Sequence, residues 1–481
     1  MIGYTLGIDV GTSGAKAALL DLDALRLASV TMQGYDNGAL QPSEMIWQAT
    51  AAIVRQAVAG IDPKAVRGIS FSAQMHGTVM YDAQGSVIEP IINWQDKRCD
   101  IPLARYDNRT TVEKIIDLLA GHDFDDLGIH VLPSGYLGAT LFYLKENDPA
   151  LFERIHHVEL PGDFIRGKLL GASDRATDPT NAFGTGLFNT RLNCWHEGII
   201  AKLGLPIDLL PVVHDSAEVA GVLPPGVAAE LNLAPGTPVV YGGGDNQMSL
   251  LGNGLVSADS PALLNIGTGA QISQVTLEYA RVPGIDTRSY FNRAYAFVGA
   301  SLGGGRSYEE LRSALSRREG REVSYREMDE LAAGAPVGAE GLAYRLASRG
   351  AVGSRDEFVG RTELQDIGHQ ARAVLEGVLL DLYRVRPPTL REGPGFMVGA
   401  GKGLQKGQVW AQMAADLLDL PLKITNFENA VWGAAVMAAV GAGAISDLRD
   451  ATATIEYSRE FSPNPIAAAQ YKYLTSAAHH R

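Results

Sequence analysis

The sequence predicts an α/β protein that is built from more than one domain. Short apolar, β-prone stretches alternate with helical stretches along the chain, which is typical of sheets whose faces are covered by helices. The chain has 481 residues, of which 46% are hydrophobic and 20% charged. It can therefore bury a sizeable core, and its length favours two domains of roughly 200–250 residues each.

The first elements follow from local patterns near the N-terminus. Two apolar stretches flank the turn sequence Gly-Thr-Ser-Gly at residues 11–14, which predicts a hairpin. A helix is expected from Ser43, its candidate N-cap, because apolar residues follow at helical spacing. The strands of this region are expected at residues 4–10, 15–20, 27–32 and 66–71.

A second hairpin of the same kind lies in the second half of the chain. Residues 262–277, ALLNIGTGAQISQVTL, form an apolar stretch, a Gly-Thr-Gly turn and a second apolar stretch. These residues alone leave a duplicated domain and a chance likeness equally open. A glycine-rich joint at residues 237–253 favours one domain over residues 1–247 and a second over residues 248–481.

Charge and cysteine content favour a small-molecule substrate. The net charge of −13 argues against a nucleic-acid partner, because such partners need basic faces. The two cysteines, Cys99 and Cys194, have no metal-ligand spacing and suggest a reducing compartment. With no signal peptide and no apolar run of about 18 residues, we expect a soluble cytoplasmic protein with no membrane partner, either a monomer or a homodimer.

Three glycine loops, at residues 11–14, 267–269 and 399–403, are candidates for phosphate binding through backbone N–H groups. Each could also be a plain tight turn. None has the spacing of a Walker A loop or a full dinucleotide fingerprint. Asp9 stands two residues before the first loop, where a carboxylate would repel phosphate. A divalent cation between them would explain the acid, since Mg²⁺ is held by one or two carboxylates and by nucleotide phosphates; otherwise Asp9 caps its own turn.

Four motifs resemble those of the FGGY carbohydrate kinases, in the sugar kinase/Hsp70/actin superfamily. They are GIDVGTSGAKAALLD, NIGTGAQIS, GAGKGLQKGQVWAQMAADLLDLPL and FENAVWGAAVMAA. The resemblance implies two ribonuclease-H-like domains that arose by duplication, with ATP and Mg²⁺ in the cleft between them. Asp9 would bind the metal. Contacts to the nucleotide are expected from Gly11, Thr12, Ser13, Lys16, Gly267, Thr268, Gly399, Ala400, Gly401 and Gln405.

Further segments resemble the sugar side of this family. They are FSAQMHGTVMYD at residues 71–82, INWQDKRC at residues 92–99 and SGYLGATLFYLKEN at residues 134–147. The resemblance implies that Asp96 and Arg98 brace the loop that carries Trp94. Sugar contacts are expected from Gln74, Met75, His76, Trp94, Tyr136, Asp245 and Asn246.

Asp245, in the sequence GGGDNQ, is predicted to be the catalytic base. The family has an aspartate at this joint, and a carboxylate can orient an alcohol and accept its proton during phosphoryl transfer. The alternative interpretation of Asp245 is an acid in a turn after three glycines.

The resemblance is strongest to sedoheptulokinases, in the stretches YFNRAY and NWQDKRC. It predicts phosphorylation of the terminal hydroxyl of sedoheptulose, with xylulose or another ketose as the alternative. A more distant alternative is an ATPase of the same superfamily that has no sugar substrate. Other polar clusters have simpler interpretations: residues 121–130 as a solvated acidic loop, and His156, His157, His479 and His480 as surface residues.

Overall fold

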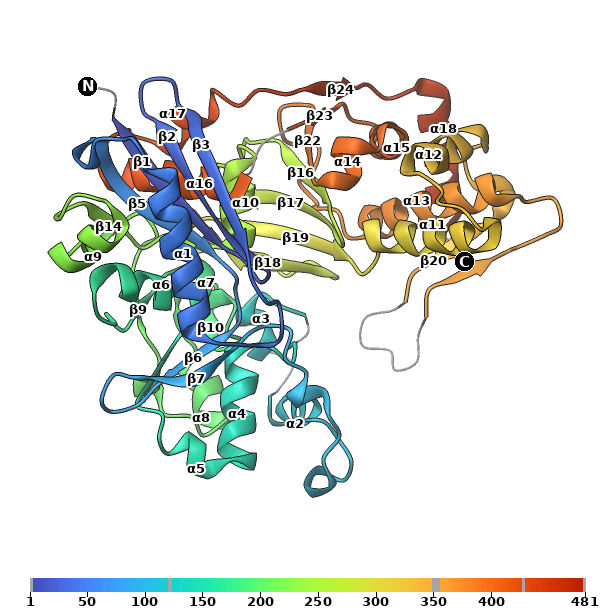
Figure 1. Cartoon of the computed structure of the whole chain (residues 1–481). Coiled ribbons are helices and arrows are strands. Elements are labelled where there is room, and N and C mark those ends of the chain that lie inside the picture. Colours follow the sequence, from blue (N-terminus) through green and yellow to red (C-terminus); the bar gives the residue numbers. More distant parts are fainter. Residues whose placement is uncertain (1–2, 120–122, 131, 348–354, 426–428, 479–481) are drawn as a thin grey trace.

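The computed structural model describes residues 3–119, 123–130, 132–347, 355–425 and 429–478 (Figure 1). Two seven-stranded sheets form its frame. The first has the order β13-β14-β5-β1-β2-β3, with β15 paired to β5. Its strands are β1 (Tyr4–Val10), β2 (Gly14–Asp21), β3 (Arg26–Gly34), β5 (Val66–Ala73), β13 (Val219–Val222), β14 (Pro238–Val240) and β15 (Gly243–Gly244).

The second sheet has the order β18-β19-β17-β16-β22-β23-β24. Its strands are β16 (Ala262–Ile266), β17 (Ala270–Thr276), β18 (Ile285–Ser289), β19 (Tyr295–Ser301), β22 (Met397–Ala400), β23 (Leu422–Ile424) and β24 (Arg459–Phe461). The predicted hairpins at residues 4–20 and 262–277 are therefore both present, one in each sheet.

The two sheets repeat one topology. In each, three antiparallel strands (β3-β2-β1 and β19-β17-β16) continue into parallel partners, β5 and β14 in the first sheet and β22 and β23 in the second. This repetition supports a duplication, and the predicted α/β fold class is confirmed. The domain boundary between residues 247 and 248 stays a prediction, because α10 (Asp245–Gly252) runs across it.

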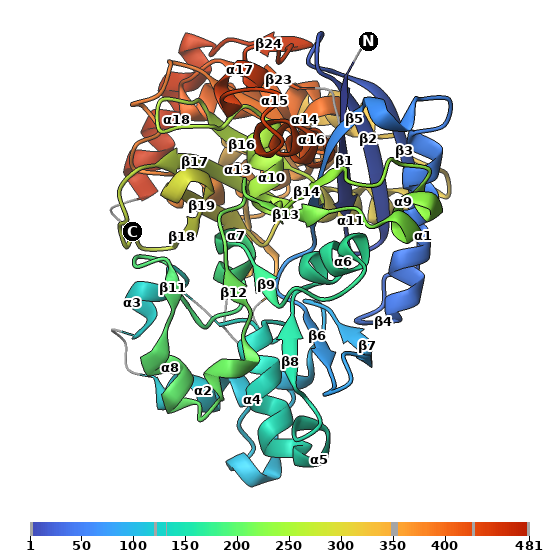
Figure 2. The same ribbon diagram turned by 90° about the vertical axis from the view of Figure 1, so that its left-hand side faces the viewer.

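Helix α16 (Asn429–Gly441) belongs to the second half of the chain but packs on β1 and β5 of the first sheet, beside α10 (Figure 2). The backbones of α16 and β1 lie close together. Thr5 Oγ1 donates to the carbonyl of Ala435 at 2.8 Å, and a Cβ on Gly7 would lie 2.2 Å from the carbonyl oxygen of Val431. Helices α10 and α16 therefore share an apolar core between the two sheets.

A third body of structure lies below the first sheet in Figures 1 and 2. It contains a sheet of order β4-β7-β6-β8 and a core that includes Leu137, Leu141 and Leu160. This body carries the predicted sugar loops. Its strands are β4 (Leu40–Gln41), β6 (Thr78–Tyr81), β7 (Val87–Ile92) and β8 (His157–Glu159), with the smaller pairs β9 (Ala176–Thr177) with β12 (Val212–Val213) and β10 (Phe188–Asn189) with β11 (Cys194–Trp195).

The helices cover these sheets. Helix α1 buries Ile46, Ile53 and Val54 against the first sheet, as their spacing predicts. The helices in the first half of the chain are α1 (Ser43–Ala57), α2 (Thr111–Leu118), α3 (Asp123–Leu127), α4 (Leu137–Asn147), α5 (Pro149–Phe152), α6 (Pro161–Leu170), α7 (Pro179–Phe183), α8 (Glu197–Lys202) and α9 (Pro225–Leu231).

In the second half, α13 and α15 pack against the second sheet in one large core. None of the helices in the described part of the chain is long and apolar enough to cross a membrane. The remaining elements are α11 (Gly305–Glu319), α12 (Tyr325–Gly334), α13 (Ile367–Arg384), α14 (Lys402–Lys406), α15 (Gln408–Leu418), α17 (Leu448–Thr452), α18 (Pro465–Ala478) and the pair β20 (Ala343–Arg345) with β21 (Glu357–Val359).

Two local predictions are wrong. Ser43 is the first residue of α1 rather than its N-cap, because its N–H and hydroxyl bind Glu89. His157 is buried, since its ring stacks on Tyr81 at 4.5 Å and its Nε2 lies 3.1 Å from Ser173 Oγ.

The acidic segment at residues 121–130 is not a solvated loop either. Asp123 begins α3, is buried, and pairs with Lys202 at 2.5 Å, because α3 packs into the structure. Its neighbour Asp126 pairs with Arg191 at 3.2 Å. Residues 121, 122, 479 and 480 lie outside the described residues.

Candidate active site

The strand order of the first sheet brings Asp9 and Asp245 to the same edge. Asp9 lies near the end of β1, level with Ser72 of β5, and Ser72 is in turn level with Gly243 of β15. All three strands run parallel, so their carboxyl ends meet at one edge, where open α/β sheets bind ligands. Two inter-strand steps, about 10 Å, separate the backbone of Asp9 from that of Gly243.

Asp9 is half-buried beneath the first glycine hairpin. Ser72 Oγ donates to its Oδ1 at 2.7 Å. Lys16 is its cross-strand neighbour on β2. The hydroxyl of Tyr35 donates to the carbonyl of Gly11, and burial, with a smaller contribution from the charge of Asp9, raises the pKa of Tyr35.

Asp245 is the first residue of α10, directly after β15. Burial raises its pKa from 3.8 to about 7, and the negative charge of Asp9 adds to the rise. The N–H of Asn246, 2.8 Å from Asp245 Oδ1, and the charge of Arg288 act in the opposite direction. A carboxyl group whose pKa lies near neutral pH is suited to accept a proton from a reacting alcohol.

The negative charge of Asp9 raises the proton affinity of Asp245, and two nearby acids also suit a cation. Among the described residues, no cluster of three or more His, Cys, Asp or Glu side chains could hold a metal ion. A cation beside Asp9 would therefore take its other ligands from water and phosphate, which is how Mg²⁺ usually binds with nucleotides.

The predicted sugar residues His76 and Tyr136 are brought together. Their rings stack with centroids 4.1 Å apart and an angle of 9° between the planes. His76 Nδ1 lies 2.8 Å from the carbonyl oxygen of Gly184, and burial, with a smaller contribution from Arg288, lowers its pKa to about 4. The ring is neutral at pH 7, with its proton on Nδ1, so Nε2 can accept a hydrogen bond from a hydroxyl group.

Gln74 and Met75 are buried instead of lining an open surface. Gln74 Nε2 donates to Gln41 Oε1 at 2.9 Å, and Gln41 Nε2 donates to the carbonyl of Thr12 at 2.8 Å. Met75 packs on Gly244, where a Cβ would lie 2.6 Å from the Met75 sulfur. Both residues support the neighbouring loops, and their direct contact with a sugar stays a prediction.

Trp94 joins the sugar side to the first glycine hairpin. Its Nε1 donates to Thr12 Oγ1 at 2.7 Å, and the residue is 44% exposed. The loop is braced as predicted, because Arg98 donates from its backbone N and from Nε to Asp96 Oδ1, at 3.0 and 2.7 Å. An exposed indole beside a candidate phosphate loop can serve as the wall of a pocket.

Sequence reasoning missed Arg288. This β18 residue donates from Nη1 to Asn246 Oδ1 at 3.2 Å and from Nη2 to Asp286 Oδ2 at 3.1 Å. Asn246 also donates from Nδ2 to Gln271 Oε1 at 2.9 Å, so its amide is engaged at both ends. The alternation in IDTRS could have revealed Arg288, because it puts two opposite charges on one face of a strand.

The first two glycine hairpins are each closed by a backbone hydrogen bond between glycines, which spans three residues in the first and two in the second. Gly11 N donates to Gly14 O at 2.9 Å, and Gly267 N donates to Gly269 O at 2.9 Å. Helix α11 begins against the second hairpin, where the N–H of Gly305 donates to Gly267 O at 2.8 Å. At the hairpin tips, Ser13 and Thr268 are exposed.

The third glycine loop offers mainly backbone. Gly399 and Ala400 end β22 and are buried. Gly401 has φ of +84°, and a Cβ there would lie 2.4 Å from the carbonyl oxygen of Ile266, so only glycine fits. The side chain of Gln405 donates to the carbonyl of Thr425 at 2.8 Å, and its predicted contact with the nucleotide stays a prediction.

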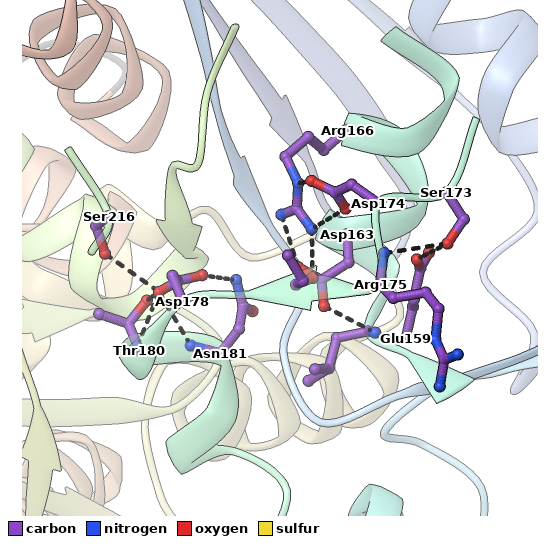
Figure 3. Close-up of polar contacts among 12 residues, drawn as sticks. Glu159, Asp163, Arg166, Ser173, Asp174, Arg175, Asp178, Thr180, Asn181 and Ser216 are labelled. Carbon is purple, nitrogen blue, oxygen red and sulfur yellow. Dashed lines mark hydrogen bonds and ion pairs between the residues drawn. The ribbon is translucent and has the colours of Figure 1, made fainter. Parts of the chain in front are cut away.

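A network of buried charges around Arg166 of α6 was also missed (Figure 3). Arg166, which is fully buried, donates to Asp163 Oδ1 at 2.9 Å and to Asp174 Oδ1 at 2.8 Å. Burial raises the pKa of Asp163 to about 7, although the charge of Arg166 opposes the rise. A second set of contacts in the same figure surrounds Asp178. Asp163 and Arg166 are three residues apart on α6, a spacing that favours pairing on one helix face, whereas Asp174 reaches Arg166 only through the turn that follows the helix.

Comparison with known proteins gives a consistent result. The model described as "FGGY family of carbohydrate kinases, N-terminal domain" matches residues 4–252. Xylulose kinase of Bacillus subtilis (strain 168) is 27% identical over 98% of this chain and 95% of its own length. Xylulose kinase of Escherichia coli (strain K12) is 30% identical over 55% of this chain and 52% of its own length.

Solved structures share the fold over the full length. A gluconate kinase from Lactobacillus acidophilus has a TM-score of 0.88 at 22% identity, covering 99% of this chain and 97% of its own. A xylulose kinase from Rhodospirillum rubrum has a TM-score of 0.87 at 24% identity, covering 98% and 97%. Plasmodium falciparum glycerol kinase with ADP has a TM-score of 0.82 at 16% identity, covering 100% and 98%.

Proposed function

Because this chain belongs to the FGGY family of carbohydrate kinases, we propose that it transfers the γ-phosphoryl group of ATP to the terminal hydroxyl of a ketose. The observation that carries the proposal is the pairing of two acids at one sheet edge, one of them with a pKa near 7. Asp245 has the proton affinity of a general base, and Asp9 lies beneath a glycine hairpin, where a metal-bound phosphate would need it.

In the proposed mechanism, Asp245 accepts the proton of the acceptor hydroxyl while that oxygen forms a bond to the γ-phosphorus. The bond between the γ-phosphorus and the leaving oxygen of ADP breaks in the same displacement. The hairpins at residues 11–14 and 267–269 bind the phosphates through backbone N–H groups. His76, Tyr136 and Trp94 wall the sugar.

Asp9 would hold Mg²⁺, directly or through water. Bound Mg²⁺ would neutralise charge that develops on the transferring phosphoryl group. Most of the rate enhancement then comes from positioning and electrostatics, with proton transfer to Asp245 adding about 10²–10⁴-fold.

For the acceptor, we favour xylulose over sedoheptulose. Curated relatives that match this chain over nearly its full length are named xylulose kinases. The YFNR stretch that suggested sedoheptulose contributes Tyr290 and Phe291 to the core between the sheets, and the Tyr290 hydroxyl donates to Leu255 O. These two side chains are therefore poorly placed to contact a sugar. The resemblance of NWQDKRC keeps sedoheptulose as the second candidate.

A coupled assay of ADP release tests both the phosphorylation of a ketose and the preference for xylulose. The panel contains xylulose, sedoheptulose, ribulose, fructose and, because of the gluconate kinase likeness, gluconate. We expect xylulose to give the highest kcat/KM and EDTA to abolish the activity. A tenfold preference for sedoheptulose, about 1.4 kcal/mol of transition-state binding, would reverse the assignment. If no ketose raised ADP release above that with ATP alone, ketose phosphorylation would be refuted.

A further inference from the structure

The glycine run that leads into Asp245 is held at both ends by residues from earlier in the chain, Ser216 and Thr180. The N–H of Gly242 donates to the carbonyl of Ser216 at 3.0 Å. The N–H of Gly244 donates to Thr180 Oγ1 at 2.9 Å. The second bond lies one residue before the candidate base, at the end of the short strand β15.

Thr180 and Ser216 both donate hydrogen bonds to one buried carboxylate, that of Asp178 (Figure 3). Asp178 Oδ1 accepts hydrogen bonds from the backbone N and the hydroxyl of Thr180 and, at 3.2 Å, from Ser216 Oγ. Its Oδ2 accepts from Asn181 Nδ2 at 2.6 Å. Asp178, Thr180 and Asn181 are fully buried and Ser216 nearly so, which makes these bonds strong and the loss of any partner costly.

The hydroxyl of Thr180 has a single proton, and it donates that proton to Asp178. Its lone pairs are therefore the groups that face the N–H of Gly244. Asp178 thus orients the Thr180 hydroxyl as an acceptor. The fit is also tight in space, because a Cβ on Gly243 would lie 2.8 Å from Thr180 Oγ1.

We propose that Asp178, acting through Thr180 and Ser216, is a positioning residue for Asp245. This inference rests on the proposed role of Asp245 as the base. Asp245 is partly buried, and the negative charge of Asp9 disfavours its ionised form, so repulsion between the two carboxylates would displace Asp245 from Asp9 if its backbone were free. The anchor at Gly244 opposes that movement, and displacement of a catalytic group by about 1 Å can cost about 10²-fold in rate.

The test compares Thr180→Val with Thr177→Val. Both threonines are fully buried and lie three residues apart, but Thr177 Oγ1 has no hydrogen-bond partner among the described residues. We expect Thr180→Val to lower kcat by at least about tenfold per folded enzyme while the Kd for ATP, measured by calorimetry, changes less than twofold. Thr177→Val should keep the wild-type kcat, and Thr180→Ser, which retains the hydroxyl, should recover most of it.

Amide hydrogen exchange gives a readout that does not depend on the substrate. Thr180→Val and Asp178→Asn should both speed exchange in the peptide that covers residues 242–247, and Thr177→Val should not. Unchanged exchange in Thr180→Val would overturn the anchor. So would a wild-type kcat in that variant when the wild-type enzyme turns over a ketose. A wild-type enzyme that phosphorylates no ketose would refute the proposed function instead, and the exchange measurement would still decide on the anchor.

Discussion

Replacing Asp245 by Asn separates the acid–base role of this carboxylate from its shape. Asn fills the same volume and can still accept the N–H of Asn246 through its side-chain oxygen, but it cannot take a proton from the acceptor hydroxyl. Loss of a general base typically costs about 10²–10⁴-fold. Because this group would also orient the hydroxyl, we expect kcat to fall toward the upper end of that range, with ATP and ketose binding largely retained.

The same substitution should stabilise the protein at neutral and alkaline pH. A rise in the pKa of Asp245 from 3.8 to about 7 corresponds to about 4 kcal/mol. Near pH 4 the native carboxyl is protonated and uncharged. As the pH rises from about 4 to 7, the unfolded chain loses this proton first, so the native state loses stability across that window. Asp245→Asn carries no such charge and should be up to about 4 kcal/mol more stable than wild type at pH 8, without Mg²⁺ or nucleotide.

Steady-state ADP release measures the first effect, and urea unfolding at pH 4 and pH 8 measures the second. Asp23→Asn, which neutralises an acid in an exposed turn, serves as the control and should change neither quantity. A variant of Asp245 that kept more than a tenth of the wild-type kcat would place the base elsewhere. Equal stabilities of wild type and Asp245→Asn at pH 8 would mean that the ionised Asp245 carboxylate does not destabilise the native state.

Three further substitutions test the surroundings. Asp9→Asn should raise the Mg²⁺ concentration needed for half-maximal activity at fixed ATP, and an unchanged titration would argue against the metal role. Arg288→Met removes a charge that lowers the pKa of Asp245, so the acid limb of the pH profile of kcat/KM should move to higher pH; a fixed limb would count against this coupling. Gly242 has φ of +74°, and Gly242→Ala would place a Cβ 2.4 Å from a backbone carbonyl oxygen. The control Gly85→Ala has a similar φ of +77° but open space around the new Cβ, and it should lower the free energy of unfolding by about 1–2 kcal/mol. Gly242→Ala should lower it by more in urea unfolding, and equal losses would contradict the packing argument.

The sequence predicted what depends on local pattern. The hairpins around Gly11 and Gly267 are encoded by short apolar strands on either side of small turn residues, and both form as expected. The resemblance also selected His76 and Tyr136, which stack in the structure although they are far apart in the chain. Motifs could not say that Gln74 would be buried against Gln41, because that contact depends on how two loops pack.

The missed residues act through contacts between distant segments. Thr180 and Ser216 lie in separate stretches that look unremarkable in sequence, and only the fold brings both of them to the glycine run before Asp245. Arg288 carried a weak local signal, the alternation of charges in a strand, but its contact with Asn246 joins two different elements. Pairings of this kind have no periodicity that a single sequence reveals.

The glycine run at residues 242–244 is closely packed in the structure. In sequence it indicates a joint between two domains, and in the structure each of its glycines packs where a Cβ would clash: against the backbone of Phe71, the hydroxyl of Thr180 and the sulfur of Met75. A carboxylate that faces a second acid needs a rigid backbone to stay in place, and close packing together with the hydrogen bonds at both ends of the run supplies that rigidity. Any motion that brings the two sheets together on ligand binding must therefore be taken up by residues other than 242–244.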